Sequence, residues 1–313
     1  MSSDASLALS VVVPAYNEAE SLPHLVSWIY DVLEQDYKDR FDVWIIDDGS
    51  SDDTATVVGR IEKEYPAVRY VQFRRNYGKA AALMEAFRRV KGKYVITMDA
   101  DLQDDPGEIP EMVEILKSGW DMVSGWKKER HDPISKTIPS KLFNAVTRLT
   151  TGIKIHDFNC GLKAYRNEVV KELTIHGELH RYIPLLAHFL GYSVTEKVVQ
   201  HHPREYGRTK YGIARFFRGF FDFITVLFLS RYTKRPMHFF GMLGLVLTGV
   251  GVIINIYLAI YWLQGGSLSN RPILFLGVLL VIVGVQFFSI GLLGEMLAYA
   301  NRDEEKPKIS QQT

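Results

Sequence analysis

The sequence predicts an α/β domain with a mostly parallel, doubly wound sheet, followed by a pair of membrane-spanning helices. Apolar runs of strand length alternate with segments of helical spacing over residues 9–126. Polar clusters follow three of these runs, at the ends where such sheets bind ligands. Beyond residue 236, two long runs carry almost no charge. These three observations together indicate the architecture.

The strand-like runs and the helical segments follow one another in regular alternation. Runs that are apolar on both faces are typical of strands covered by helices on both sides of a sheet. Pro14 is predicted to end the first strand. Gly49 is predicted to permit a tight turn after the second strand, and Ser50 or Ser51 to cap the next helix. The predicted strands are 9–16, 41–50, 68–73, 93–101 and 121–126, and the predicted helices are 19–35, 52–65, 78–90 and 107–119.

The composition and the absence of certain motifs exclude several classes of protein. A net charge of +1 over 313 residues argues against a generally basic nucleic-acid binder. The single cysteine, Cys160, cannot form an intrachain disulfide, and no Cys/His spacing typical of zinc sites occurs. Neither GxGxxG nor a P-loop pattern occurs, so a dinucleotide dehydrogenase and a P-loop phosphotransferase are unsupported. The first ten residues lack the basic and long apolar regions of a secretory signal peptide.

The two apolar runs, 237–263 and 272–294, are predicted to cross a membrane as a hairpin. At about 1.5 Å per residue each run spans a hydrocarbon core of about 30 Å. A pair of buried helices in a soluble protein is the alternative. Arg271 is the only basic residue in the loop between the runs, whereas several basic residues flank the hairpin. The positive-inside rule therefore predicts that both ends and the large domain lie in the cytoplasm. The basic residues that directly flank the hairpin are Arg231, Lys234 and Arg235 before it and Arg302, Lys306 and Lys308 after it.

The chain is thereby divided into four predicted parts. Residues 1–211 form the catalytic domain, and residues 212–235 mix phenylalanines with arginines in a way that favours interfacial helices over a core helix. The transmembrane part is 236–300, with spans at about 237–263 and 272–298, and residues 301–313 form a flexible tail.

Four carboxylates, Asp99, Asp101, Asp104 and Asp105, crowd the end of the fourth predicted strand. Burying like charges together costs several kcal/mol unless positive charge compensates them. A divalent cation is the compensator that the cluster predicts, because hard oxygen ligands suit Mg²⁺ or Mn²⁺, and these ions also bind nucleotide phosphates. A solvated turn with aspartates that cap the next helix is the alternative.

These motifs resemble those of the family 2 glycosyltransferases with a GT-A fold. The segments VVVPAYNE, DDGSSDDT, NYGKAAAL and DADLQDDP occur in this order, and DFNCGLKAYR and REYGRTKYG follow. Within that family the chain is similar to the polyprenyl-phosphate glycosyltransferases, including the bactoprenol glucosyltransferases and dolichol-phosphate mannose synthases. The resemblance implies a membrane-anchored, inverting transfer of a hexose from a nucleotide sugar to polyprenyl phosphate at the cytoplasmic membrane face. UDP-glucose and undecaprenyl phosphate are the leading pair, with Mg²⁺ or Mn²⁺ as cofactor.

The resemblance also implies roles for individual residues at the donor site. Glu18 and the pair Asp47 and Asp48 contact the base and ribose, since carboxylates at strand ends accept hydrogen bonds from hydroxyl and N–H groups. Lys79, at a helix N-terminus, faces an anionic donor or is a solvated charge. The implied nucleotide-sugar residues are Pro14, Ala15, Tyr16, Glu18, Asp47, Asp48, Lys79, Asp99, Ala100, Asp101, Arg204 and Lys210, and the implied metal ligands are Asp99, Asp101 and Gln103.

Asp157 is the implied catalytic residue, and Lys127, Lys136 and Ser140 are implied to hold the acceptor phosphate. A phosphate monoester has a second pKa of about 6, so it is mostly dianionic at neutral pH and hardly needs a base. We therefore interpret Asp157 as a positioning and electrostatic residue, and a loop acid that caps a turn is the alternative. Relatives often carry arginine at positions 127 and 136, which puts the detailed contacts of these lysines in doubt.

The sequence leaves alternatives open for the donor, for the function and for the oligomeric state. Other donors are GDP-mannose, a UDP-aminoarabinose derivative and UDP-GlcNAc. A processive polysaccharide synthase would usually carry more spans and a QxxRW motif, which are absent here. A non-catalytic membrane scaffold is the rival of a different class. The resemblance also suggests a homo-oligomer such as a tetramer, packed through the hairpins at Gly241, Gly244, Gly249 and Gly251.

Overall fold

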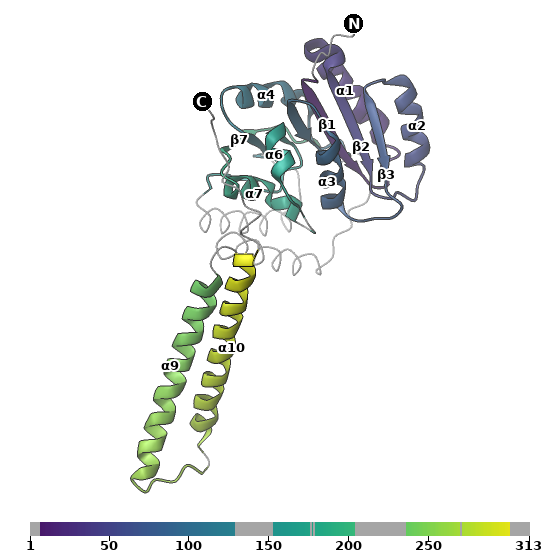
Figure 1. The fold of residues 1–313 in the computed structure, drawn as a ribbon. Coiled ribbons are helices and arrows are strands. Elements are labelled where there is room, and N and C mark those ends of the chain that lie inside the picture. The colour runs from purple at the N-terminus through teal and green to yellow at the C-terminus, as the bar shows by residue number, and fades with distance from the viewer. Residues whose placement is uncertain are drawn as a thin grey trace. The chain divides into compact units, whose positions relative to one another are not determined.

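The computed structural model describes residues 7–128, 153–175, 177, 179–203, 236–269 and 271–300, without the side chains of 298–300. It divides the chain into two compact units, Met1–Phe223 and Ile224–Thr313. The first unit carries the sheet, and the second carries two long helices (Figure 1).

The first unit is built on a seven-stranded sheet in the order β3-β2-β1-β4-β6-β5-β7. The neighbours β1–β2, β2–β3, β1–β4 and β5–β7 are parallel, whereas β6 runs antiparallel to both β4 and β5. The mostly parallel sheet predicted from the sequence is therefore confirmed, and the antiparallel strand is an addition to it. The strands are β1 Leu9–Ala15, β2 Phe41–Asp47, β3 Val68–Gln72, β4 Tyr94–Thr97, β5 Met122–Trp126, β6 Lys163–Arg166 and β7 Val194–Val198.

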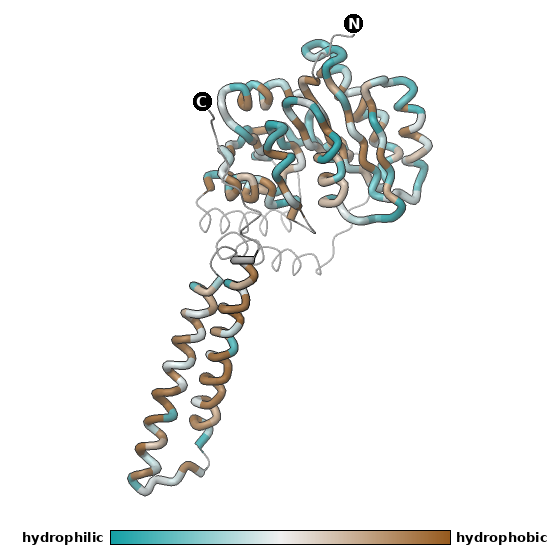
Figure 2. The backbone as a smooth tube through the Cα atoms, in the orientation of Figure 1, coloured by the Kyte–Doolittle hydropathy of each residue, from teal (hydrophilic) through white to brown (hydrophobic). Residues whose placement is uncertain are grey.

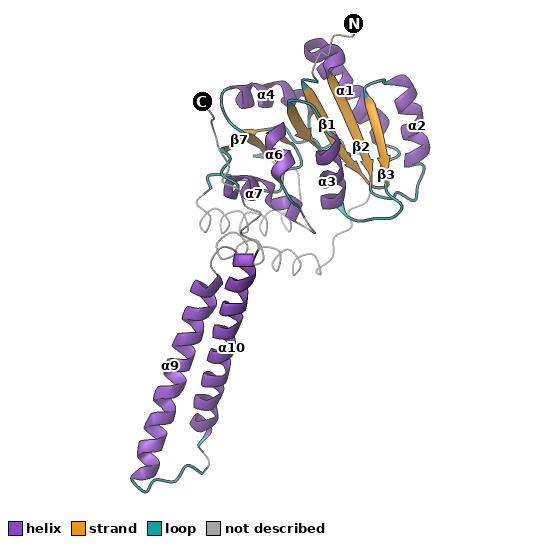
Figure 3. Cartoon of the chain, viewed as in Figure 1, coloured by secondary structure: helices purple, strands orange, loops and turns teal. Residues whose placement is uncertain are grey.

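Helices cover both faces of this sheet (Figure 3). Val11 and Val13 of β1 pack in one core cluster with residues of α1, α2 and α4, and Val12 packs in a second cluster with residues of α3, α6 and α7. The alternation of side chains along β1 thus fills two cores from one strand. The helices are α1 Leu22–Tyr37, η1 Lys38–Arg40, α2 Thr54–Glu64, α3 Lys79–Arg89, η2 Pro106–Glu108, α4 Ile109–Lys117, α6 Asn167–Glu172, η3 Leu179–Tyr182 and α7 Ile183–Phe189.

The prediction that Pro14 ends the first strand is wrong. Strand β1 continues to Ala15, and Pro14 is in register with Ile46 of β2. The oxygen of Val12 accepts from the Met98 N–H on the β4 side, so the nitrogen of Pro14, two residues further on, points to the same side. Proline has no N–H to donate on that side, so the pairing with β4 stops at Val12 and Thr97, whereas the pairing with β2 continues to Ala15 and Asp47.

The second unit contains α9 Pro236–Leu263 and α10 Pro272–Ala300, both long and apolar enough to cross a membrane. Figure 2 shows apolar residues along both helices. Only 17% and 11% of their most apolar stretches are buried inside the structure. Such exposure disfavours the alternative of a buried soluble hairpin, because a soluble core would cover these side chains.

Glycines bring the two long helices into close contact. A Cβ atom at Gly244 would lie 2.6 Å from the Gly284 carbonyl oxygen, and one at Gly251 would lie 2.7 Å from the Gly277 oxygen. Gly244 and Gly251 therefore pack within one hairpin, where the sequence suggested contacts between chains. Gly249 is exposed and faces open space. The homo-oligomer stays a prediction. Because Gly244 and Gly251 already face the other helix of their own hairpin, they are not available for contacts between chains.

Candidate active site

A pocket of about 330 Å³ lies where the carboxyl ends of β1, β2 and β4 meet. In parallel sheets this edge collects the loops that bind ligands. Of the residues predicted to bind the donor, nine line this pocket, and Asn76 and Gly78 complete the lining. The nine are Pro14, Ala15, Tyr16, Glu18, Asp48, Lys79, Asp99, Ala100 and Asp101. The structure thus brings together residues from four separate motifs of the sequence.

The loops after β1 and β2 hold each other through Ser50 and Asn17. The backbone N–H of Asn17 donates to Ser50 Oγ at 2.9 Å, and the Ser51 N–H donates to Asn17 Oδ1 at 2.8 Å. Ser50 also donates to Asp47 Oδ1 at 2.6 Å. The prediction that Ser50 or Ser51 caps the next helix is wrong, because α2 begins later, at Thr54, and these serines link two loops instead.

The neighbouring acids Asp47 and Asp48 have different surroundings. Asp47 is fully buried and accepts from the Ser50 N–H at 2.8 Å and from the Tyr70 hydroxyl at 2.7 Å. Asp48 lines the pocket and accepts from the N–H groups of Tyr77 and Gly78 at 2.7 and 2.8 Å. Burial raises the pKa of Asp48, and the two N–H groups offset only part of this rise. Asp47 therefore stabilises the loop, and Asp48 is the member of the pair that faces the pocket.

Asp99 forms an ion pair with Lys79 at the wall of the pocket. Burial alone would raise the pKa of Asp99, but the Lys79 ammonium more than offsets this and holds it well below its ordinary value. The two side chains keep 36% and 34% of their surface exposed, so both remain open to a ligand.

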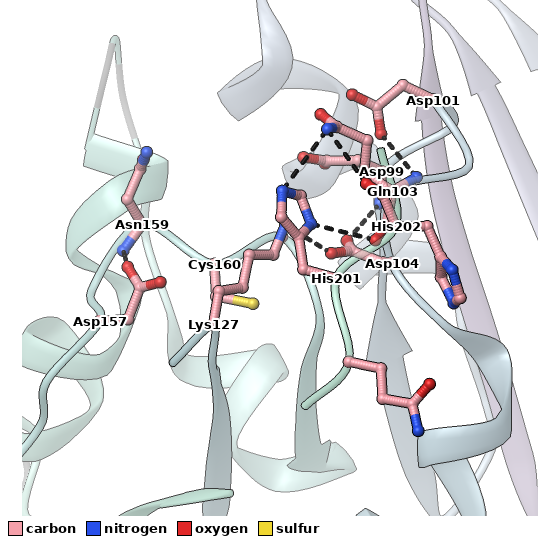
Figure 4. A network of polar contacts seen from close by, with 12 residues as sticks. Asp99, Asp101, Gln103, Asp104, Lys127, Asp157, Asn159, Cys160, His201 and His202 are labelled. Carbon is pink, nitrogen blue, oxygen red and sulfur yellow. Dashed lines mark hydrogen bonds and ion pairs between the residues drawn. The ribbon is translucent and has the colours of Figure 1, made fainter. Parts of the chain in front are cut away.

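A second lysine compensates another acid of the cluster. Lys127 Nζ lies 2.8 Å from Asp104 Oδ1, and the Asp104 side chain is 0% exposed. Asp105 accepts from the Gly107 N–H at 2.7 Å and contacts His202 Nε2 at 3.1 Å. The sequence predicted a cation as the compensator of this cluster. The structure shows that lysines already neutralise two of its four acids: Lys79 pairs with Asp99 and Lys127 pairs with Asp104. Figure 4 shows Lys127 beside the acidic loop.

Asp101 and Gln103 complete the acidic loop. The Gln103 N–H donates to Asp101 Oδ1 at 3.4 Å, and Gln103 Nε2 lies 3.5 Å from His201 Nε2. Within the described residues, no three His, Cys, Asp or Glu side chains form a ready-made metal cage. The oxygens of Asp99, Asp101 and Gln103 nevertheless suit an ion that takes one or two carboxylates and completes its shell with water and phosphate oxygens. The donor set therefore fits Mg²⁺ or Mn²⁺ bound together with a diphosphate.

Asp157 lies in a buried turn away from the acidic loop. Its side chain accepts from the Asn159 N–H at 3.0 Å, and the residue is 1% exposed. Figure 4 shows Lys127 and Cys160 between this turn and the acidic loop. The geometry places Asp157 as a fixed, buried carboxylate, consistent with a positioning and electrostatic role.

Three residues around the acidic loop were not predicted from the sequence. His201 forms a β-bridge with Asp104, and the His202 N–H donates to the Gln103 oxygen at 3.0 Å. Lys163 is buried, donates to the Cys160 oxygen, and has a pKa lowered by burial. The adjacent histidines before Pro203 were the available signal for the first two, and the lysine of the GLK segment was the signal for the third.

Some predicted residues lie outside the part of the chain that the structure describes. Among them are Lys136 and Ser140 of the acceptor site, Arg204 and Lys210 of the donor site, and the interfacial segment 212–235. Their roles stay predictions.

Known proteins resemble this chain over most of its length. The family described as Glycosyl transferase family 2 matches residues 10–174. A dodecaprenyl-phosphate galacturonate synthase of Rhizobium johnstonii is 39% identical in an alignment of 309 residues that covers 96% of this chain and 91% of that protein. An undecaprenyl-phosphate 4-deoxy-4-formamido-L-arabinose transferase of Pseudomonas fluorescens is 35% identical over 292 residues, with 92% and 84% coverage.

A solved structure shares the fold. Glucosyl-3-phosphoglycerate synthase from Mycobacterium tuberculosis, in complex with Mn²⁺, UDP-glucose and phosphoglyceric acid, superimposes with a TM-score of 0.54. The two sequences are 19% identical, and the match covers 72% of this chain and 80% of that chain. The predicted α/β GT-A fold is confirmed.

Proposed function

Because the chain belongs to glycosyltransferase family 2, we propose that it transfers a sugar from a nucleotide sugar to a polyprenyl phosphate. One observation carries this proposal. Acids that follow three separate strands, Glu18, Asp48 and the Asp99–Asp101 pair, meet in one pocket with Lys79 from the start of α3. The two relatives that align with nearly the whole chain bear the names of polyprenyl-phosphate sugar enzymes, which supports the same class of acceptor.

The pocket suits the nucleoside end of a donor through its carboxylates. Glu18 accepts from the Ser21 hydroxyl at 2.7 Å, which fixes its carboxylate on the wall of the pocket. Glu18 and Asp48 would accept hydrogen bonds from ribose hydroxyls or a base N–H. Lys79 is half-exposed beside Asp99, so its ammonium would turn to the diphosphate of the donor while Asp99 faces the cation.

Asp99, Asp101 and Gln103 would hold the Mg²⁺ or Mn²⁺. When bound, the cation neutralises the negative charge that develops on the departing nucleoside diphosphate. The Mycobacterium tuberculosis synthase of the same fold was solved with Mn²⁺ and UDP-glucose, which supports a divalent cation in a site of this kind.

The reaction would be an inverting displacement. An oxygen of the polyprenyl phosphate forms a bond to C1 of the sugar, and the bond from C1 to the nucleoside diphosphate breaks. The phosphate is already mostly dianionic at neutral pH, so no proton has to leave with the attack. Asp157 would orient the reacting groups and shape the local field from its buried turn.

The identity of the transferred sugar is a separate, more specific part of the proposal. Glucose from UDP-glucose, with undecaprenyl phosphate as acceptor, is the leading pair from the sequence. The relatives bear the names of galacturonate and formamido-arabinose enzymes, so these sugars belong beside glucose in any test. The product would be a lipid-linked sugar at the cytoplasmic face of the inner membrane, where the two apolar helices anchor the chain.

Labelled donors test this function directly. The purified full-length chain is incubated with undecaprenyl phosphate, Mg²⁺ or Mn²⁺, and labelled UDP-glucose, UDP-galacturonate or a UDP-formamido-arabinose. We expect label from one donor to enter the organic phase, and to stay out when lipid or cation is omitted. Label that stays in water with every donor and both cations would favour the scaffold instead.

A further inference from the structure

We infer that Lys127 and Asp104 form a buried brace that sets the position of the acidic loop for the donor and its cation. Lys127 would then act on the donor site, whereas the family resemblance implied contact with the acceptor phosphate. The inference rests on the proposed function, since it concerns the same site.

The brace joins the end of β5 to the start of the acidic loop. Lys127 directly follows β5, and its Nζ lies 2.8 Å from Asp104 Oδ1. The other carboxylate oxygen of Asp104 accepts from the backbone N–H of Asp99 at 3.2 Å. One buried carboxylate thus ties the lysine to the backbone of the first acid of the loop.

Burial makes this pair different from the Lys79–Asp99 pair. The Lys127 and Asp104 side chains are 14% and 0% exposed, against 34% and 36% for Lys79 and Asp99. Burial by itself lowers the pKa of Lys127, but the Asp104 carboxylate raises it above its ordinary value, so the ammonium stays charged. A lipid phosphate that took this ammonium would leave Asp104 buried and unpaired, which is strongly unfavourable. Lys127 is therefore committed to Asp104.

Gly161 packs tightly against the carboxylates of Asp99 and Asp104. A Cβ atom at this position would lie 2.6 Å from Asp99 Cγ and 2.7 Å from Asp104 Oδ2. The carbonyl oxygen of Gly161 accepts from the Thr97 hydroxyl at 3.1 Å, which fixes the glycine against the end of β4. The segment that follows Asp157 thus presses on both carboxylates with no room for a methyl group.

The brace predicts an effect on the donor in the absence of any acceptor. Binding of UDP with Mn²⁺ to the full-length chain is measured by calorimetry without polyprenyl phosphate. We expect Lys127→Met and Asp104→Asn each to weaken binding about tenfold or more, because the loop loses its support. Lys127→Arg retains a cation and should stay within about threefold of the wild type. The double variant, which removes both charges, should recover part of the loss.

Glycine variants test the brace without removing a charge. Gly161→Ala should displace the carboxylates of Asp99 and Asp104 and weaken UDP binding by about tenfold. Gly59→Ala is the matched control, because a Cβ atom at this helical position meets nothing within 4 Å. This pair keeps the inference testable even where a lysine variant does not fold.

The outcomes separate this inference from the proposed function. If Lys127→Met binds UDP and Mn²⁺ like the wild type but raises the KM for the lipid, Lys127 serves the acceptor and the brace is wrong. Unchanged UDP binding by Gly161→Ala would also overturn the brace. If the wild type itself binds no UDP or nucleotide sugar with either cation, the result contradicts the proposed function, and the brace has no donor site to support.

Discussion

Two lysines form ion pairs with the acidic loop, and they differ in how easily each could give up its carboxylate partner for a phosphate. Lys79 is half-exposed at the pocket wall, so a phosphate can replace Asp99 as its partner at little cost in desolvation. Lys127 lies under the loop, where its partner Asp104 is fully buried. We therefore propose that Lys79 contacts the ligand and that Lys127 supports the protein.

Lys79→Met should weaken the binding of UDP-glucose about tenfold at low salt, because the pocket loses a cation beside the diphosphate. The loss should shrink as salt is added, since an exposed charge is screened. Titration calorimetry at two ionic strengths checks both parts. Lys63→Met, at an exposed position of α2, is the control that should leave the affinity unchanged. Equal affinities of Lys79→Met and wild type would show that Lys79 pairs with Asp99 and does not bind the donor.

The low pKa of Asp99 leads to a prediction about pH. The unfolded-state pKa of an aspartate is about 3.9. Because the folded-state pKa lies below this value, the stabilisation from the Lys79–Asp99 pair is fully present above about pH 4 to 5 and is lost only as the pH falls through the folded pKa. Asp99 therefore needs no deprotonation to bind a cation at neutral pH.

We expect the affinity for UDP-glucose with Mn²⁺ to stay within about threefold between pH 5.5 and 8. UDP-glucose is the suitable ligand because its diphosphate has no ionisation near neutral pH, unlike the terminal phosphate of UDP. Calorimetry across this range measures the affinity. Burial raises the pKa of Asp48 in the same pocket, so the Asp48→Asn variant is titrated as well. A steady decline toward pH 5.5 that persists in this variant would assign the titration to Asp99 and contradict the ion pair seen in the structure.

Asp157→Asn separates a positioning role from that of a general base. Asparagine can still accept from the Asn159 N–H, so the buried turn should keep its shape. We expect turnover to fall about a hundredfold while UDP binding stays unchanged. The pH profile of kcat/KM should keep the acid limb near pH 6 that comes from the acceptor phosphate. A limb that disappears in the variant would instead identify Asp157 as the base.

At the scale of elements, the sequence predicted those with strong periodicity and missed those with weak periodicity. Strands β1 to β5 and the helices between them follow from long apolar runs. Strand β6 has four residues and begins with Lys163, which is buried, so its pattern resembles a loop. Its antiparallel place between β4 and β5 depends on tertiary pairing that no local pattern reports.

The candidate site was predictable to a similar degree. Motifs at strand ends identified most of the pocket lining, because strand ends meet at a common edge. The partners of the acids were not predictable in this way. Lys127 lies 23 residues from Asp104 in the sequence, and only the fold reveals that its ammonium is buried against that carboxylate.

The contact between α9 and α10 gives a prediction about the hairpin. Gly244→Leu should splay the two helices, because even a Cβ atom there would overlap the backbone of α10. Overpacking of this kind costs about 1–3 kcal/mol. Gly249→Leu adds the same side chain on an open face of α9 and should be tolerated. The melting temperature of the detergent-solubilised monomer, in which Gly249 meets no second chain, compares the two, and an equal decrease in both would contradict the described packing.

At the scale of the whole molecule, the chain joins a pocket for a soluble donor to an apolar hairpin that suits a membrane. A polyprenyl acceptor is itself confined to the membrane, so an anchored enzyme meets it in two dimensions. The direction in which the hairpin is inserted then decides on which side the donor must be present. Orientation is therefore a functional property of the chain, and the distribution of basic residues predicts it.

Single introduced cysteines can measure this orientation. The wild-type chain contains one cysteine, Cys160, which is buried and should give little background labelling. Ser267→Cys lies in the exposed loop between α9 and α10, and Ser118→Cys lies on the exposed surface after α4. Because that loop carries only Arg271 while six basic residues flank the hairpin, we expect the loop outside and the catalytic domain in the cytoplasm. A membrane-impermeant thiol reagent should label Ser267→Cys in intact cells and Ser118→Cys only after lysis. The opposite pattern would place the pocket outside the cell, away from nucleotide sugars, and would contradict both the orientation and the cytoplasmic reaction.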